Sequence, residues 1–354
     1  MDMKSLSFLD RWLTLWIALA MLAGITLGVW APGWTVWISS MSAGTTSIPL
    51  AIGLILMMYP PLAKVRYEEM GRSLKGNRRL LLLSLVQNWI VGPLVMTGLA
   101  ILFLHAHPGY LIGVVLVGLA RCIAMVVVWN DLAGGHREFG VGLVALNALF
   151  QLLFYSFYIW LFITVFLGST GLVPGVQANV SIWDSAKTVL IYLGIPFVAG
   201  FVSRRILVRL KGKDWYETRF VPKISPLTLI FLLFTIVVMF SLQGTAFLQR
   251  PGDVLLVALP LILYFALIWF STLFIARALG GSYEESAAAA FSAASNDFEL
   301  AIAVAIALWG AASPQAFAAV IGPLIEVPVM VLLVKVALSW KDRLWNDKGK
   351  NVTG

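Results

Sequence analysis

The chain has 354 residues, of which 60% are hydrophobic and 12% are charged, and its formal net charge is +8. Its mean hydropathy of +0.91 and its recurring apolar runs lie far outside the range of soluble globular proteins. The composition therefore excludes a soluble protein and predicts one that crosses a membrane several times.

Ten apolar segments follow one another along the chain. They comprise residues 11–30, 47–63, 80–104, 109–130, 139–167, 184–208, 223–246, 253–278, 283–308 and 314–340. A helix needs about 20 apolar residues to cross the hydrocarbon core of a bilayer. Runs of this length suit helices rather than the shorter alternating strands of a membrane barrel, so we predict an all-α fold with ten transmembrane helices.

Lysine and arginine residues indicate the orientation. They are concentrated in the loops 64–79 and 204–223 and in the tail after residue 340, whereas Arg250 is the one basic residue in the loops on the opposite side. Because cytoplasmic loops are enriched in Lys and Arg, we predict a multi-pass protein of the plasma (inner) membrane with both termini in the cytoplasm. The positive charge then fits topology and contact with the anionic lipid bilayer, and no nucleic-acid partner is expected.

The ten segments divide into two halves of five, which comprise residues 1–170 and 171–354. An odd number of spans per half inverts the second half relative to the first, as in inverted-repeat transporters. One internal echo is that Asn147 and Gln151 stand four residues apart in the fifth segment, where the tenth has Gly322 and Glu326. We therefore predict one integral membrane transporter unit made of two inverted five-helix repeats.

Polar residues interrupt the fourth and ninth segments near mid-depth. The fourth contains Arg121 and Cys122, the only cysteine of the chain, and the ninth contains Asn296, Asp297 and Glu299. Ionisable groups at the bilayer centre are costly and persist mainly along a pathway or at a substrate site. Because broken helices at corresponding places in two halves indicate a transporter's substrate site, we predict the site where these segments cross.

Four motifs stand out in these and neighbouring segments. They are Met57-Met-Tyr-Pro-Pro-Leu-Ala-Lys64, Gly118-Leu-Ala-Arg-Cys-Ile-Ala-Met125 with Val128-Trp129-Asn130, Ala294-Ser-Asn-Asp-Phe-Glu-Leu-Ala301 and Gly322-Pro-Leu-Ile-Glu-Val-Pro-Val329. Together these motifs resemble the Acr3 family of arsenite efflux permeases. The resemblance covers nearly the whole chain. It implies a fold related to the bile acid sodium symporters, with core and panel domains and crossed, discontinuous helices 4 and 9.

The resemblance also implies an activity. Family members extrude trivalent arsenite, and some also antimonite, by using the proton gradient to confer arsenical resistance. The cysteine and the glutamate that the family requires match Cys122 and Glu299 in this sequence. The resemblance therefore implies an arsenite/proton antiporter.

The chemistry of Cys122 agrees with a thiophilic substrate. Trivalent arsenic prefers sulfur ligands, and a single thiol permits both capture and release. The neighbouring Arg121 would favour the thiolate, but adjacent residues of a regular helix point about 100° apart, so this role requires a broken helix. A solitary cysteine in a membrane helix is more often a packing residue, whereas its place beside a mid-membrane arginine favours substrate binding.

Three acids are candidates for proton coupling. Removal of a carboxyl group from water favours its protonated form, which would let Glu299 take up and release protons at cellular pH. Asp297 and Glu326 are rivals, and a structural salt bridge from Arg121 to one of these acids is the alternative for each. The sequence leaves open which acid titrates, how many protons move in each cycle and whether antimonite is carried.

Four amides complete the predicted site: Asn130, Asn147, Gln151 and Asn296. Arsenite at neutral pH is an uncharged triol, so amide donors and acceptors suit it. Amides in membrane helices also hold neighbouring helices together by hydrogen bonds, and both roles stay open here.

Two rival functions stand beside arsenite efflux. The nearer is a sodium-coupled symporter of organic anions on the same fold, with oxygen ligands for sodium from Asn296, Asp297, Glu299 and Gln151. The more distant is an intramembrane enzyme, but the sequence has none of the common hydrolase or protease motifs. It also has no nucleotide-binding loop, so energy would come from an ion gradient or from an optional separate ATPase subunit. We expect no cofactor, and the sequence does not indicate an oligomeric state.

Overall fold

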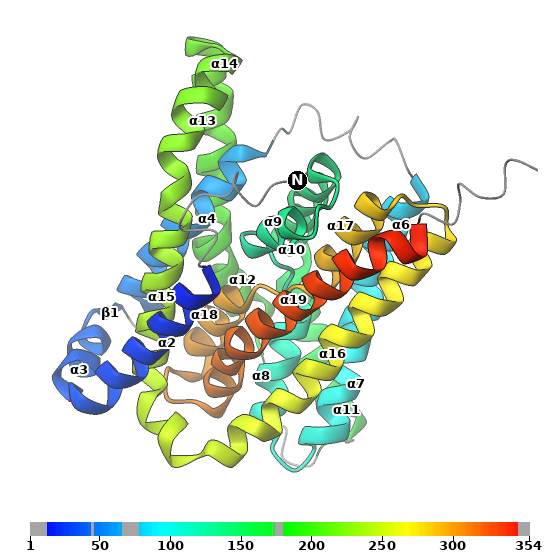
Figure 1. Ribbon diagram of the computed structural model, residues 1–354. Coiled ribbons are helices and arrows are strands. Elements are labelled where there is room, and N and C mark those ends of the chain that lie inside the picture. Colours follow the sequence, from blue (N-terminus) through cyan, green and yellow to red (C-terminus); the bar gives the residue numbers. More distant parts are fainter. Residues whose placement is uncertain (1–12, 44–45, 66–77, 172, 174–179, 346–354) are drawn as a thin grey trace, which may run out of the picture.

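The computed structural model describes residues 13–43, 46–65, 78–171, 173 and 180–345, and nearly all of them are helical (Figure 1). Within this part, two short antiparallel strands, β1 (Ser42–Ala43) and β2 (Thr46–Ser47), form a hairpin. Apart from this short hairpin, the regular structure of the described residues is helical, and the prediction of an all-α fold is confirmed for them. Most of the loop 64–79, much of the junction between the proposed halves and the tail beyond residue 345 lie outside them.

Helical segments occur at each of the ten predicted positions. They are α2 (Leu13–Trp30); α4 (Ile48–Lys64); α6 (Arg78–Val86), η2 (Gln87–Val91) and α7 (Gly92–Leu104); α8 (Pro108–Leu119) and α9 (Met125–Leu132); α10 (Arg137–Ile159), η3 (Trp160–Leu167) and α11 (Gly168–Thr170); α12 (Ile182–Val189), η4 (Leu190–Gly194) and α13 (Ile195–Lys211); α14 (Lys213–Trp215), η5 (Tyr216–Phe220) and α15 (Val221–Gln249); α16 (Pro251–Ala278); α17 (Tyr283–Ala294) and α18 (Phe298–Trp309); and α19 (Pro314–Trp345). A further helix, α3 (Pro32–Ser40), follows α2.

Six helices of the described residues are long and apolar enough to cross a membrane, and there are seven if α2 and α3, bent by 97°, form one span. The helices α4, α8 and α18 are apolar but shorter. Length and composition therefore support a protein that crosses a membrane many times, whereas the count of ten spans stays a prediction.

Three of the π-helical turns share a cause that is visible in the sequence. The turns η2, η4 and η5 each end two residues before a proline, namely Pro93, Pro196 and Pro222. Proline has no backbone N–H and its ring collides with the carbonyl group one turn earlier, so a widened turn accommodates it inside a continuous helix. The helices thus pass these prolines without a break.

The helices pack in two groups. In one group, α15 packs against α2 and α4, and α4 packs against α13; these helices stand together on the left of Figure 1. In the other group, α16 packs against α7, α17 and α19, and α8 packs against α7 and α19. Between the groups, α19 contacts α2 and α15, α15 contacts α16, and α18 contacts both α4 and α8. The space between the groups is where the candidate site lies.

Two of the predicted segments are interrupted. The helix α8 ends at Leu119 and α9 begins at Met125, while α17 ends at Ala294 and α18 begins at Phe298. The second interruption has a local cause, because the side chain of Asp297 caps α18 by accepting a hydrogen bond from the backbone N–H of Leu300. Ala124, which precedes α9, makes no such bond.

Candidate functional site

The two interruptions meet each other. Arg121 and Asn296 form an antiparallel bridge pair. The backbone N–H of Cys122 donates to the carbonyl of Ser295 at 3.3 Å, and that of Asp297 donates to the carbonyl of Ala120, also at 3.3 Å. Backbone groups released from a helix inside a membrane need such partners, because lipid offers none. The structure thus brings the polar centres of the fourth and ninth segments into direct contact.

Asn296 caps the end of α8 from the opposite strand of this crossing. Its side-chain nitrogen Nδ2 donates to the carbonyls of Val117 and Ala120, at 2.8 and 2.9 Å. These carbonyls belong to the last turn of α8, where a helix leaves its acceptors unpaired. The amide orientation of Asn296 is therefore set by two bonds, and its oxygen Oδ1 is left without a partner.

Arg121 serves the helix ends in a similar way. Its fully buried guanidinium group donates to the carbonyls of Gly118 in α8 and Ala293 in α17, and to the hydroxyl of Tyr264 at 2.8 Å. A cation is favourable at the C-terminal end of a helix, where the helix dipole is negative. These three acceptors are neutral, so these contacts of the guanidinium do not include the salt bridge to a site carboxylate that was the structural alternative.

Glycine makes room for the guanidinium. A Cβ atom at Gly92 would lie 3.0 Å from Nη1 of Arg121 and 3.1 Å from the hydroxyl oxygen of Tyr264. Gly322 plays a comparable part in α19, where a Cβ atom would lie only 1.9 Å from the ring of Phe298. Both glycines therefore permit a side chain of the crossing to pack directly on a helix backbone.

Gln151 joins the two interruptions. Its oxygen Oε1 accepts from the backbone N–H of Arg121, and its nitrogen Nε2 donates to Oδ2 of Asp297 at 3.1 Å. Oδ1 of Asp297 accepts from Leu300, as described above. Both carboxylate oxygens of Asp297 thus have structural partners, and Gln151 is completely buried behind the crossing.

Cys122 is buried beside a serine that the sequence analysis did not single out. Its side chain is 4% exposed and contacts the side chain of Ser295. The hydroxyl of Ser295 donates to Oε1 of Glu326 at 2.5 Å. Thiol, hydroxyl and carboxyl group therefore form one connected cluster. The only hint of Ser295 in the sequence is its place directly before Asn296 and Asp297.

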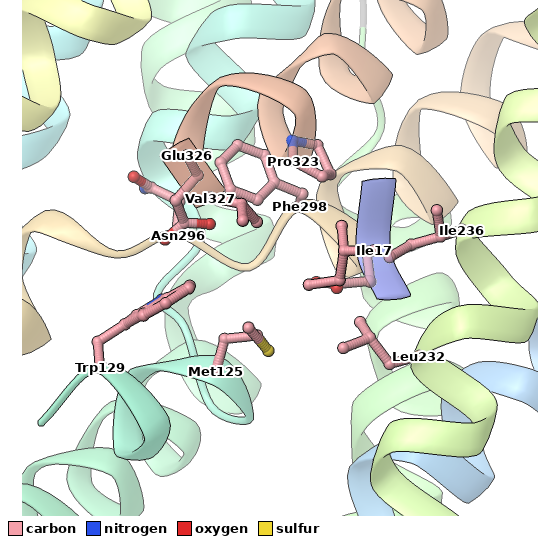
Figure 2. A pocket seen from close by; sticks show the side chains of 11 residues that line it. Ile17, Met125, Trp129, Leu232, Ile236, Asn296, Phe298, Pro323, Glu326 and Val327 are labelled. Atoms are coloured by element: carbon pink, nitrogen blue, oxygen red, sulfur yellow. The ribbon is translucent and has the colours of Figure 1, made fainter. Parts of the chain in front are cut away.

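A small cavity lies between the two helix groups (Figure 2). Ile17 of α2 and Leu232 and Ile236 of α15 form its apolar side. Its other side carries the polar groups and comes from α9, from Asn296 and the start of α18, and from α19. The polar lining residues are Trp129, Asn296, Glu299 and Glu326. The remaining lining residues are Met125, Phe298, Pro323 and Val327. Cys122 is not among the residues that line this cavity.

The acids of the site differ in their surroundings. Glu299 and Glu326 line the cavity, whereas Asp297 lies behind it and contacts the side chain of Glu299. Glu299 is 9% exposed and Asp297 is 1% exposed. The two glutamates are therefore the acids that a ligand in the cavity would meet.

Two predicted site residues lie elsewhere. The side chain of Asn147 is hydrogen-bonded to Asn88, Trp89 and Ser292 and so holds three helices together. The side chain of Asn130 packs against Gly135, where a Cβ atom would lie 1.9 Å from Oδ1, at the end of α9 away from the crossing. Their substrate contacts stay predictions.

Trp129 is a polar residue of the cavity that the sequence analysis did not include in the predicted site. It belongs to a motif that carries the family resemblance, but a tryptophan in an apolar segment gives no signal that separates ligand contact from packing. Its side chain is 1% exposed, and its indole nitrogen has no hydrogen-bond partner.

Comparison with known proteins agrees with this architecture. Residues 51–250 match the sodium bile acid symporter family. The arsenical-resistance protein Acr3 of Corynebacterium glutamicum is 46% identical over 335 residues, which cover 95% of this chain and 90% of the relative. The arsenical-resistance protein Acr3 of Alkaliphilus metalliredigens is 32% identical over 345 residues, which cover 94% of this chain and 93% of the relative.

An uncharacterized transporter of Synechocystis sp. is 34% identical over 352 residues, covering 94% of this chain and 89% of the relative. Each of these three relatives thus matches over at least 94% of this chain. The chain therefore belongs to the sodium bile acid symporter family and, within it, to the Acr3 family of arsenical-resistance proteins.

Proposed function

We propose that the protein exports trivalent arsenite from the cytoplasm in exchange for protons and thereby confers arsenical resistance, with antimonite as a second candidate substrate. Two relatives that match over nearly the whole chain are named arsenical-resistance proteins. The observation that carries the proposal is the position of Cys122, the only cysteine, at the crossing of the two interrupted helices.

Cys122 is the proposed arsenic ligand. Its thiol displaces one hydroxyl group of arsenite. An As–S bond forms, one As–O bond breaks, and the released hydroxyl group leaves as water after taking up the thiol proton. The other hydroxyl groups of the substrate are then within the reach of polar side chains such as Asn296 and Glu326. Because Cys122 does not line the cavity, substrate binding in this proposal includes a small opening between Asn296 and the thiol.

Glu299 is the proposed proton carrier, with Glu326 and Asp297 as the other candidates. A carboxyl group that faces the cavity can hold a proton in its neutral form and accept a substrate hydroxyl when it is ionised. Exchange follows if protonation and arsenite binding exclude each other at these oxygens. Glu299→Gln should then transport arsenite without responding to a pH gradient, whereas Asp297→Asn should retain the response.

The inverted repeat is part of the proposal, with halves at residues 1–170 and 171–354. It is supported by the reciprocal 3.3 Å backbone bonds at the crossing. Gln151 also follows Arg121 by 30 residues, and Glu326 follows Asn296 by the same number. Each of these residues lies against its own interruption, as two related halves require.

Movement of one helix group against the other would open the cavity to alternate sides. The group of α2, α4, α13 and α15 would be the panel, and the group that carries the crossing would be the core. In this arrangement ten spans place both termini in the cytoplasm of a cell whose inner membrane holds the protein. The proton gradient supplies the energy, so the proposal needs neither a cofactor nor an ATPase subunit.

Sodium-coupled transport of an organic anion is the second candidate, favoured by the family to which residues 51–250 belong. The cavity argues against an anion, because the described residues that line it include two glutamates and no lysine, arginine or histidine. Membership in a transporter family disfavours an intramembrane enzyme.

Arsenite uptake into everted membrane vesicles tests the proposal. An imposed pH gradient, acidic inside, should drive uptake without sodium, and collapse of the gradient should stop it. A strict sodium requirement would favour sodium coupling, and the absence of arsenite uptake under both gradients would reject arsenite as the substrate.

A further inference from the structure

Two buried polar atoms in the cavity wall lack partners. They are the indole nitrogen Nε1 of Trp129 and the amide oxygen Oδ1 of Asn296, and both side chains are 1% exposed. Buried polar groups in proteins are nearly always hydrogen-bonded, because an unpaired one costs free energy. Figure 2 shows both side chains on the same side of the cavity, opposite Ile17 and Ile236. Such a pair is suited to a bound molecule.

The two atoms have opposite and fixed hydrogen-bonding roles. An indole N–H only donates. The amide of Asn296 could in principle turn either end to the cavity, but its Nδ2 already donates to Val117 and Ala120. Rotation of the amide would place its oxygen against those two carbonyl oxygens. Asn296 therefore presents an acceptor, and Trp129 presents a donor.

The rest of the polar wall adds acceptors. Glu299 and Glu326 contribute carboxylate oxygens, and the other described lining residues are apolar. The indole of Trp129 is thus the one unpaired side-chain donor among the described residues of the wall. An oxyanion brings only acceptors and negative charge, so it would meet repulsion at three places and a donor at one. An uncharged hydroxyl compound brings O–H donors for the acceptors and an oxygen for the indole.

We propose that Trp129 and Asn296 are the specificity-determining pair of this cavity, and that they select an uncharged molecule with several hydroxyl groups and reject oxyanions. The indole N–H donates to one hydroxyl oxygen of the ligand, and Oδ1 of Asn296 accepts the proton of another hydroxyl. This inference rests on the proposed transport of arsenite, which is such a molecule, and adds a selection step that does not depend on the thiol.

Boric acid separates the hydrogen-bonding step from thiol capture. It is an uncharged triol at neutral pH and has no preference for sulfur ligands. In everted vesicles, boric acid should inhibit arsenite uptake competitively, whereas phosphate and arsenate at the same concentrations should not. Equal inhibition by phosphate and boric acid, or no inhibition by boric acid while arsenite uptake proceeds, would overturn the inference.

A pair of matched variants assigns the effect to the donor. Trp129→Phe removes the indole N–H from the cavity wall and keeps an aromatic ring. Trp269→Phe makes the same change at a tryptophan of α16 that is also buried with an unpaired indole nitrogen but does not line the cavity. Loss of one hydrogen bond should weaken inhibition by boric acid about tenfold in Trp129→Phe and leave it unchanged in Trp269→Phe.

A second pair isolates the acceptor. Asn296→Leu and Asn296→Asp both remove Nδ2 and its bonds to α8, but only Asp keeps an oxygen near the position of Oδ1. Inhibition by boric acid should be about tenfold weaker in the Leu variant than in the Asp variant. Equal inhibition in both would remove Asn296 from the pair. The competition by boric acid in the unaltered protein decides the inference even if these variants do not fold.

The outcomes separate this inference from the proposed function. If the protein transports no arsenite, the proposed function fails, whatever boric acid does. If arsenite is transported in a Cys122-dependent way and boric acid has no effect, the function stands and the specificity pair is wrong.

Discussion

The two interruptions at the crossing share a backbone geometry and differ in what holds them open. The interruption before α18 contains Asn296 and Asp297, and Asp297 caps the helix that follows. The interruption before α9 has no capping side chain of its own. It relies on Gln151, which accepts from the backbone of Arg121, and on Asn296, which caps α8.

The two interruptions therefore differ in what causes them and in the groups that they contribute. The ninth segment breaks because of its own residues and provides most of the polar atoms. The break in the fourth segment is held by pairing with the ninth segment. The fourth segment contributes the thiol of Cys122 and the guanidinium group of Arg121. The thiol is therefore positioned by the contacts that join the two interruptions, and variants of those contacts should affect arsenite binding.

Among variants at the crossing, Arg121→Leu should cause the largest loss of stability. It leaves the carbonyls of Gly118 and Ala293 and the hydroxyl of Tyr264 without their donor, at a cost of about 3 kcal/mol or more. We expect a lower thermal stability in detergent and no arsenite uptake. Arg209→Leu, at an exposed position of α13, is the control and should unfold like the unaltered protein. Equal stability of the two variants would show that the guanidinium is not structural.

Gln151→Leu should come next. It removes one acceptor from the first interruption and one donor from the second, with an expected loss of about 2 kcal/mol. Thermal unfolding measures the loss, and Gln249→Leu at the exposed end of α15 is the matched control. If Gln151 holds the first interruption open, arsenite uptake per folded protein should fall in Gln151→Leu. A variant with full uptake would contradict that dependence.

Asp297→Ala should have the smallest effect of the three. The loss of a helix cap costs about 1 kcal/mol, and the bond from Gln151 is lost as well. Asp297→Ser keeps a capping oxygen and should lose less stability. If both variants unfold at the same temperature, the second interruption is not held by its own cap.

The sequence was sufficient to predict the helical class, the positions of the helices and the two segments whose polar centres meet. The length of the apolar segments predicts the helices, and the polar residues within two of these segments mark them as exceptional. Neither argument requires knowledge of tertiary contacts. The run Ser295-Asn296-Asp297 also contains residues that favour helix caps, so the second interruption had a local signal. The first had none, because residues 120–124 include no proline or glycine.

The length of the first interruption bears on Asn130, which was grouped with Cys122 in the predicted site. Five residues without helical structure separate α8 from α9, and no sequence pattern indicates how they orient the side chains that follow. Ser295 is of interest because it donates a hydrogen bond to Glu326, and Trp129 because its indole nitrogen has no hydrogen-bond partner. Such information exists only when the packed helices are known.

Cys122→Ser tests the central claim most directly. Serine is close to cysteine in size but offers oxygen instead of sulfur, so packing at the crossing should survive while the arsenic ligand is lost. In everted vesicles that contain equal amounts of the two proteins, the account predicts pH-driven arsenite uptake by the unaltered protein and none by Cys122→Ser. Uptake at the normal rate by Cys122→Ser would contradict the account.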